Sequence, residues 1–322
     1  MSKRTRRLCM VVLTCAVVGL VLSRARVAPA ADPPKPWAFL PWDQAVGRVI
    51  GQQSDSEGPK SFALEPDGGV LVLDQVNRRV LDLDAKGQVR GTIALPAATF
   101  DDVEQFEGRA VLVLDRLVSK VLLVMDLKGT TLAEVALEGR GIERSGLVTA
   151  MLPRPDGVWL EVEHRHSVRV LDRHLKPCER QVVLGRPMAN GRSLRGALDG
   201  RGGLSLSTSR RNDGAAEASV TLTGQAPIGR LVWLDADAEG RVHAVLHEIE
   251  RSATPPYRVQ RERYWLIVLD EQLHELDRTE SSRVLTEYDQ SVEFRLGPDG
   301  RLWQMAFTPD GVQILDWGRR VP

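Results

Sequence analysis

Apolar and polar positions alternate in short runs along most of this chain, and tight-turn signals separate the runs. The clearest stretch is 62–95, which predicts four β-strands within 34 residues. Its turns carry Pro66-Asp67-Gly68-Gly69 and Asp84-Ala85-Lys86-Gly87, where glycine supplies positive φ and aspartate tolerates it. The strands are expected at Phe62–Glu65, Val70–Asp74, Arg79–Asp84 and Val89–Leu95. Four strands in this length are typical of one β-propeller blade.

The same unit recurs along the chain. An acidic residue followed by glycine marks the turn between the first two strands of each unit, at Asp67-Gly68, Glu107-Gly108, Asp156-Gly157, Asp199-Gly200, Glu239-Gly240 and Asp299-Gly300. Successive turns are 40, 49, 43, 40 and 60 residues apart, near the repeat length of propellers. Second strands are predicted at Ala110–Asp115, Val158–Glu163, Leu204–Thr208, Val242–His247 and Leu302–Phe307. Third strands are predicted at Val121–Asp126, Val168–Asp172, Ala218–Leu222, Trp265–Asp270 and Val312–Asp316. Six turns predict six blades.

The last unit has only three strands before the chain ends. Val46–Ile50 reads as a single strand without a hairpin partner, so we expect it to complete the last blade. Such closure removes exposed sheet edges. The predicted fold is therefore all-β, a six-bladed β-propeller of four-stranded blades over residues 46–322, closed by an N-terminal strand. The proline-rich segment 31–45 is expected to be an extended lead-in.

Residues 1–30 have the pattern of an export signal. Lys3–Arg7 is basic, Leu8–Leu22 is an apolar run, and Ala28-Pro29-Ala30 has the small-x-small form of a cleavage site. Arg24 and Arg26 after the apolar run leave an uncleaved anchor open as the alternative. The pattern predicts bacterial export to the periplasm or the medium, with no membrane attachment after cleavage.

Charge and cysteine content limit the classes of partner and the means of stabilisation that the sequence predicts. The first 30 residues hold six basic side chains and no acidic one, so the remainder has 37 basic against 43 acidic residues, a net charge of −6. An acidic body gives no reason to expect nucleic acid as a partner. Cys178 is the one cysteine outside the signal, so packing alone must hold the fold. We expect a monomer.

One segment carries a family resemblance. Val70–Asp84, VLVLDQVNRRVLDLD, is similar to the NHL repeat, in which a strand, an Asp and an Asn-Arg pair precede an apolar strand. Asn77, Arg78 and Val80 occupy the matching places, and Leu112–Asp126 matches in part. NHL-like propellers include scaffolds, ligand-binding receptors and a few lyases and hydrolases. The resemblance therefore implies the fold more than a function.

Motifs of known catalytic constellations are missing from the sequence: there is no Gly-x-Ser-x-Gly, Walker loop, Cys-x-x-Cys or His-Glu-x-x-His. His164 and His166 share one strand face, as do His243 and His247, and two such pairs could hold zinc. Some NHL-like lyases use histidines in this way. However, His243 and His247 lie at opposite ends of their strand, which favours solvent-facing polar positions.

A second metal candidate is the set of residues that end the second strands: Asp74, Asp115, Glu163, Thr208, His247 and Phe307. Six-bladed lactonase-like propellers bind a divalent ion at the channel, and oxygen ligands suit calcium. The alternative is structural, because an aspartate in this place can cap turn amides or pair with an arginine such as Arg78. We predict no cofactor, with a calcium or zinc ion on Asp74, Asp115, Glu163 or His247 as the alternative.

The third candidate is a pair of long connections between second and third strands. They are Thr208–Glu217 in the fourth blade and Glu248–Arg263 in the fifth, both expected as loops on the face opposite the acidic-Gly turns. Arginine and tyrosine are favoured at interfaces. The predicted binding residues are Arg210, Arg211, Arg251, Tyr257, Arg258, Arg261, Arg263 and Tyr264. Two tolerated insertions without a partner are the alternative.

Two functions fit this sequence. The first is an exported binding or scaffold propeller that holds a protein or a small ligand on the face carrying these two connections. The second is a metal-dependent hydrolase or lyase with its site at the central channel. The lack of a recognisable catalytic motif favours binding.

Overall fold

The computed structural model of this chain describes residues 34–51, 56–211, 214–281 and 288–319. The predicted signal at 1–30 and part of the predicted lead-in lie outside these residues. Among the described residues, no helix is long and apolar enough to cross a membrane.

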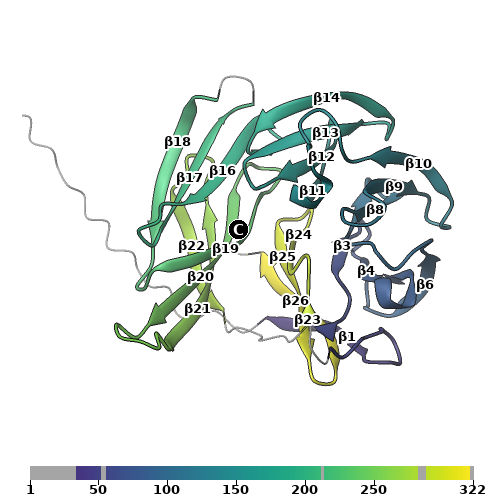
Figure 1. Cartoon of the computed structure of the whole chain (residues 1–322), viewed down its shortest axis with the longest axis horizontal. Coiled ribbons are helices and arrows are strands. Elements are labelled where there is room, and N and C mark those ends of the chain that lie inside the picture. The colour runs from purple at the N-terminus through teal and green to yellow at the C-terminus, as the bar shows by residue number, and fades with distance from the viewer. Residues whose placement is uncertain (1–33, 52–55, 212–213, 282–287, 320–322) are drawn as a thin grey trace, which may run out of the picture.

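Six antiparallel four-stranded sheets form a ring, with the last sheet beside the first (Figure 1). The first three blades comprise β3 (Ser61–Leu64), β4 (Val70–Asp74), β5 (Arg79–Leu83) and β6 (Val89–Ala94); β7 (Asp102–Phe106), β8 (Ala110–Asp115), β9 (Val121–Met125) and β10 (Thr131–Ala136); and β11 (Val148–Arg154), β12 (Gly157–Val162), β13 (His166–Asp172) and β14 (Pro177–Leu184). The last three comprise β15 (Arg186–Pro187), β16 (Arg192–Leu198), β17 (Gly203–Arg210) and β18 (Ala216–Thr223); β19 (Ile228–Ala236), β20 (Val242–Arg251), β21 (Val259–Leu269) and β22 (Glu275–Ser281); and β24 (Phe294–Leu296), β25 (Arg301–Thr308), β26 (Gly311–Arg319) and β1 (Lys35–Pro41). The predicted six-bladed β-propeller is confirmed.

Four short elements complete the described secondary structure. The two-residue strands β2 (Ser56–Glu57) and β23 (Tyr288–Asp289) pair in parallel. Two 3-10 turns, η1 (Gln75–Asn77) and η2 (Ser145–Leu147), lie in the first and third blades.

The acidic-Gly turns have the conformation that their residues favour. The glycine in all six has a φ between 70° and 136°, a region that other residues rarely adopt. In the fourth blade, the Asp199 carboxylate accepts hydrogen bonds from the backbone N–H groups of Arg201 and Gly203, at 2.7 and 2.9 Å. Side chain and backbone together thus fix the tight reversal between strands.

The apolar face of each sheet packs against its neighbour. One buried cluster joins the first blade to the second through residues such as Leu71, Ile93 and Val113, and a second joins the last blade to the first through Phe62 and Phe307. This arrangement explains why the second strands read as continuous apolar runs: both of their faces are covered by adjacent blades.

The ring is closed by an N-terminal strand, but not by the one that the sequence suggested. β1 (Lys35–Pro41) pairs with β26, whereas Val46–Ile50 makes only isolated bridges, from Val46 to Trp42 and from Val49 to Glu57. This strand was not expected from the sequence, because its segment is rich in proline and prolines disfavour most strand positions. β1 is the outermost strand of its sheet, where a missing backbone N–H can face solvent instead of a partner.

The fourth blade departs from the repeat. Its sheet begins with the two-residue β15, which pairs only with Ser193 and Leu194 of β16 within the described chain. The Asp199-Gly200 turn therefore joins the second and third strands of this sheet, whereas the corresponding turns elsewhere join the first and second.

Candidate functional site

The connection predicted as a loop at 248–263 is largely a continuation of the fifth-blade hairpin. β20 runs to Arg251 and β21 begins at Val259, leaving only 252–258 as loop. Opposite charges face one another across this extension, because Glu248 is in register with Arg263 and Glu250 with Arg261. Such cross-strand pairs stabilise an antiparallel ladder, so the strands continue where a loop was expected. The connection at 208–217 is shortened in the same way by β17 and β18.

Four of the predicted binding residues gather at the end of this hairpin: Arg251, Tyr257, Arg258 and Arg261. All four are exposed, and 54% of the surface of Tyr257 is accessible. Within the described residues, none of their side chains takes part in an ion pair or a hydrogen bond. They form what we call the hairpin tip.

The two arginines predicted in the fourth blade serve their own neighbourhood instead. Arg210 pairs with Glu217 at 3.0 Å, and Arg211 with Asp156 of the third blade at 2.5 Å. The Arg211 guanidinium also lies 5.4 Å from the ring centre of Trp159. Arg211 therefore links two blades, and neither arginine belongs to the hairpin tip.

The last two predicted residues are buried. Arg263 is 5% exposed and donates a 2.6 Å hydrogen bond to Gln225. Tyr264 is 9% exposed and stacks on His247, with ring centres 4.6 Å apart. Both lie too deep to take part in a binding surface, because Arg263 and Tyr264 sit on the part of β21 that packs within the propeller.

Asp74, the first metal candidate, is completely buried and already surrounded by donors. Its carboxylate accepts hydrogen bonds from the Gly47 backbone N–H at 3.0 Å, from Asn77 at 2.9 Å and from Arg79 at 2.8 Å. The arginine partner is thus Arg79, not Arg78, which adopts a left-handed conformation at the end of η1. These contacts agree with the alternative to metal binding, in which the aspartate caps backbone amides and pairs with an arginine.

Asp115 holds a turn in the second blade. It accepts hydrogen bonds from the Thr99 hydroxyl at 2.6 Å and from the backbone N–H groups of 117–119. Burial alone would raise the pKa of Asp115, but these hydrogen bonds lower it overall. Glu163 lies near Arg165 at 3.8 Å. His247 lies 3.2 Å from Glu262. Over the described ranges, no three His, Cys, Asp or Glu side chains converge as a metal site would need.

A charged cluster that the sequence reasoning missed lines the central channel. Arg295 of β24 pairs with Asp102 at 2.6 Å and with Glu104 at 2.5 Å, both on β7. Across the channel, Arg154 of β11 pairs with Asp235 of β19 at 2.5 Å. Except for Asp102, these residues line a cavity of about 380 Å³ with walls from all six blades, which we call the channel cavity.

Glu104 is the most perturbed member of this cluster. Burial raises the pKa of its carboxyl to about 8, although the nearby Arg295 charge opposes the rise and Asp102 adds to it. A buried carboxyl that holds its proton near neutral pH is a frequent feature of functional sites.

A sequence signal for this cluster exists. Glu104, Arg154, Asp235 and Arg295 each lie two to four residues before the acidic-Gly turn of their blade. In a propeller this is the end of the innermost strand, so charged residues there converge on the axis. A charged residue at this position of several first strands is therefore a signal for a charged cluster at the axis.

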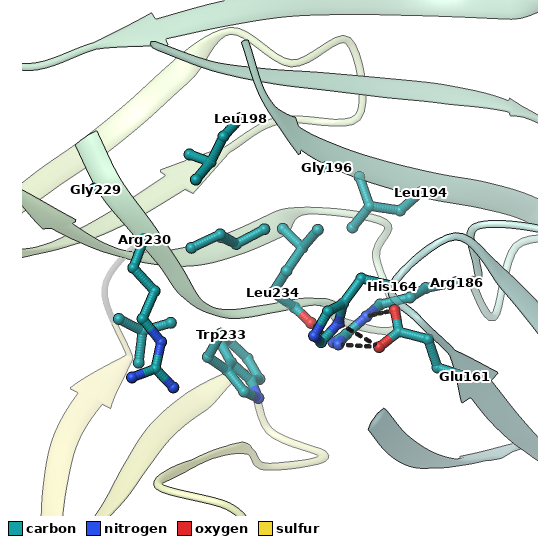
Figure 2. A pocket seen from close by; sticks show the side chains of 12 residues that line it. Glu161, His164, Arg186, Leu194, Gly196, Leu198, Gly229, Arg230, Trp233 and Leu234 are labelled. Atoms are coloured by element: carbon teal, nitrogen blue, oxygen red, sulfur yellow. Dashed lines mark hydrogen bonds and ion pairs between the residues drawn. The ribbon is translucent and has the colours of Figure 1, made fainter. Parts of the chain in front are cut away.

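A second cavity lies between the inner strands of the fourth and fifth blades, and we call it the apolar cavity (Figure 2). Its volume is about 400 Å³. The lining comprises Glu161, His164, Arg186, Leu194, Gly196, Leu198, Gly229, Arg230, Leu231, Val232, Trp233 and Leu234. Trp233 also lines the channel cavity, so one side chain borders both spaces.

A buried ion pair closes one end of the apolar cavity. Arg186 donates two hydrogen bonds to Glu161, at 2.5 and 2.8 Å, and its remaining nitrogen donates to the Leu234 carbonyl. The His164 ring and the Thr149 hydroxyl also contact the Glu161 carboxylate, at 2.9 and 2.8 Å. Burial opposes ionisation, but the Arg186 charge and the His164 contact hold the pKa of Glu161 well below its usual range.

Comparison with known proteins supports the fold. No protein-family model and no curated protein matches this sequence. Among solved structures, the chain is similar to hydrazine synthase from Kuenenia stuttgartiensis, with a TM-score of 0.54 and 12% identity over 79% of this chain and 76% of that one. It is also similar to a DUF4221 family member from Bacteroides vulgatus, with 10% identity over 88% and 96% and a TM-score of 0.48. BamB from Moraxella catarrhalis is 13% identical over 89% and 98%, with a TM-score of 0.40. At 12% identity the likeness to hydrazine synthase concerns fold alone. The six four-stranded sheets themselves define the chain as a six-bladed β-propeller.

Proposed function

We propose that this chain is an exported binding module that holds a partner protein on the hairpin tip. The observation that carries the proposal is the set of exposed side chains of Arg251, Tyr257, Arg258 and Arg261, which have no partner among the described residues, on a hairpin that extends past its own blade. β19 begins at Ile228, opposite Glu248, so the last residues of β20 stand beyond the first strand of the sheet.

The chemistry of the hairpin tip suits an acidic protein surface. Glu250 is the one exposed acid among its three arginines, so the tip is locally basic on a chain whose body carries a net negative charge. Arginine and tyrosine offer apolar area together with directed hydrogen bonds, and they are enriched among residues that dominate binding energy.

The test replaces Tyr257, Arg258 and Arg261 with alanine. We expect partner capture to weaken by about 1–3 kcal/mol, the scale of a small hot spot, while the melting temperature stays unchanged. The matched control replaces the exposed Leu117 and Val118, in the corresponding connection of the second blade, and should not alter capture. Partners are identified by crosslinking in the native envelope fraction, and affinity is then measured with the purified partner. Equal affinity of the triple variant and the unchanged protein would refute the proposal.

Export is a second part of this proposal and rests on the 1–30 pattern. We expect the mature chain to begin near Ala31, which mass spectrometry of the protein from its native host would show. An intact N-terminus on membrane-bound protein would instead identify an anchor.

The kinship of the first blade to the NHL repeat is also a proposal. The contact of Asp74 with Asn77 supports it, because it gives the Asp and the Asn of the pattern a structural reason. The arginine that pairs with Asp74 is Arg79, one position after the Arg78 of the pattern.

The alternative function, a metal-dependent hydrolase or lyase, is favoured by one observation in the channel cavity. Glu104 has a pKa of about 8, so it would be protonated near neutral pH and could act as a general acid. Metal analysis of the purified protein tests this alternative. A stoichiometric divalent ion whose removal abolishes an ester- or lactone-cleaving activity would support it, and protein without ion or activity would exclude it.

A further inference from the structure

The apolar cavity has the composition of a small-molecule site. We infer that it binds an amphipathic monocarboxylate, with an apolar body against the leucines and Trp233 and a carboxylate on Arg230. This site is separate from the hairpin tip, so it stands or falls independently of the proposed protein partner.

The walls supply the apolar half of the site. Leu198 is 44% exposed, and Leu231, Val232 and Trp233 are only half-buried although all of them line the cavity. Leu231 packs against the cluster between the fourth and fifth blades, whereas Val232 and Trp233 also contact the cluster between the fifth and sixth. Most large apolar residues of the inner strands are covered by the next blade. Half-buried apolar side chains around one cavity mark a place where a ligand would remove further apolar surface from water.

The charges supply the polar half. The Glu161 carboxylate is matched by two hydrogen bonds from Arg186, so that pair presents little net charge to the cavity. Arg230 is exposed, and within the described residues its side chain has no ion pair or hydrogen bond. Figure 2 shows Arg230 at one end of the cavity and the Glu161–Arg186 pair at the other, with Trp233 and Leu234 between them. The net charge of this lining therefore favours an anion.

The backbone is shaped around this space. β19 has two irregularities in its pairing with β20, between Ile228 and Arg230 and between Leu231 and Trp233. Bulges of this kind redirect side chains and are frequent beside functional sites. On the opposite wall, β15 covers only the start of β16, so the edge from Gly196 to Leu198 stays open toward the cavity.

The dimensions set the ligand class. A cavity of about 400 Å³ is at the small end of the range for ligand sites and suits a body of one ring or a short chain. With one charged contact and an apolar body, a ligand of about a dozen heavy atoms should bind with a dissociation constant of roughly 10 µM to 1 mM.

The experiment uses three probes with the same body: 4-phenylbutyrate, 4-phenylbutylamine and 4-phenylbutanol. Calorimetric titration of the full mature chain should show one site for the carboxylate, binding about tenfold or more tightly than the alcohol and more tightly still than the amine. Equal affinities for the carboxylate and the amine would overturn the proposal. So would a lack of carboxylate binding at concentrations well above 1 mM.

Variants then locate the site. Arg230→Gln should weaken carboxylate binding about tenfold and leave the alcohol unchanged, whereas Arg230→Glu should reverse the preference toward the amine. Arg201→Gln is the matched control, because Arg201 is exposed on the face of the acidic-Gly turns. Leu231→Trp, which adds bulk where Leu231 approaches Gly196 on the opposite wall of the cavity, should weaken all three probes. Unaltered carboxylate affinity in Arg230→Gln, with an unchanged melting temperature, would refute the assignment.

Discussion

Truncating Leu40 tests whether β1 closes the ring. Leu40 is 2% exposed, lies in register with Val312 of β26 and packs in the cluster between the last and first blades. Removing a fully buried leucine side chain to alanine costs about 2–5 kcal/mol, because both the transfer energy and a cavity contribute. At about 2–4 °C per kcal/mol for a chain of this size class, the melting temperature of Leu40→Ala should fall by roughly 5–15 °C.

The matched control is Ile50→Ala, because Val46–Ile50 was the strand first expected to close the ring. Ile50 is 60% exposed, so its truncation should change the unfolding free energy by less than about 0.5 kcal/mol. The assay is denaturant unfolding and thermal melting of both variants, with size-exclusion chromatography to detect association through open sheet edges. A loss for Ile50→Ala equal to that for Leu40→Ala would refute the assignment of the closing strand.

Three further predictions concern buried charges. Glu161→Gln should destabilise the fold by about 3–5 kcal/mol above pH 5, because Arg186 is left without its carboxylate. Since the folded pKa of Glu161 is lowered, the difference in stability between variant and unchanged protein should shrink as the pH falls below 4. Melting curves at several pH values would reveal this. Glu104 has a folded pKa of about 8, above its ordinary value of 4.5, so its contribution to the free energy of unfolding should decline as the pH rises from about 4.5 to 8. The stability of Glu104→Gln should lack this decline. Parallel stability profiles of the variant and the unchanged protein against pH would contradict the argument. Asp74→Ala removes the acceptor of three donors and should lower the free energy of unfolding in denaturant by about 2–4 kcal/mol. Added calcium should change the melting temperature of neither protein. A calcium-dependent rise in the melting temperature of the unchanged protein would assign Asp74 to a metal site instead.

Local pattern was enough to predict the blades. Ala110–Asp115 was predicted as a second strand and is β8 with the same bounds, because an apolar run between turn residues has few other solutions. The acidic-Gly turns set the register in the same local way in every blade except the fourth, where the turn joins the second and third strands. The closing strand failed for a reason that no local pattern contains: Pro36 and Pro41 are acceptable only because β1 lies at the outer edge of its sheet.

The candidate sites were harder to predict, since they depend on which blades face one another. Arg230 and Glu161 are 69 positions apart and meet around one cavity only through the ring. Arg263 and Arg261 look alike in the sequence, but strand pairing buries the first and exposes the second. Arginine count alone could not separate them, because exposure depends on where the hairpin leaves the sheet.

The pairing of β1 with β26 also determines the order in which this molecule can fold. Lys35 is in register with Asp316, so the first described strand finds its partner only after nearly the whole chain has been synthesised. Blades one to five are built from contacts that are local in the chain and can form early, whereas the final ladder has one of the largest sequence separations available to the chain. We therefore expect a late, slow step in refolding in which the two ends meet. Until then β26 carries an open edge, and this is the period in which the molecule is most exposed to association with another copy.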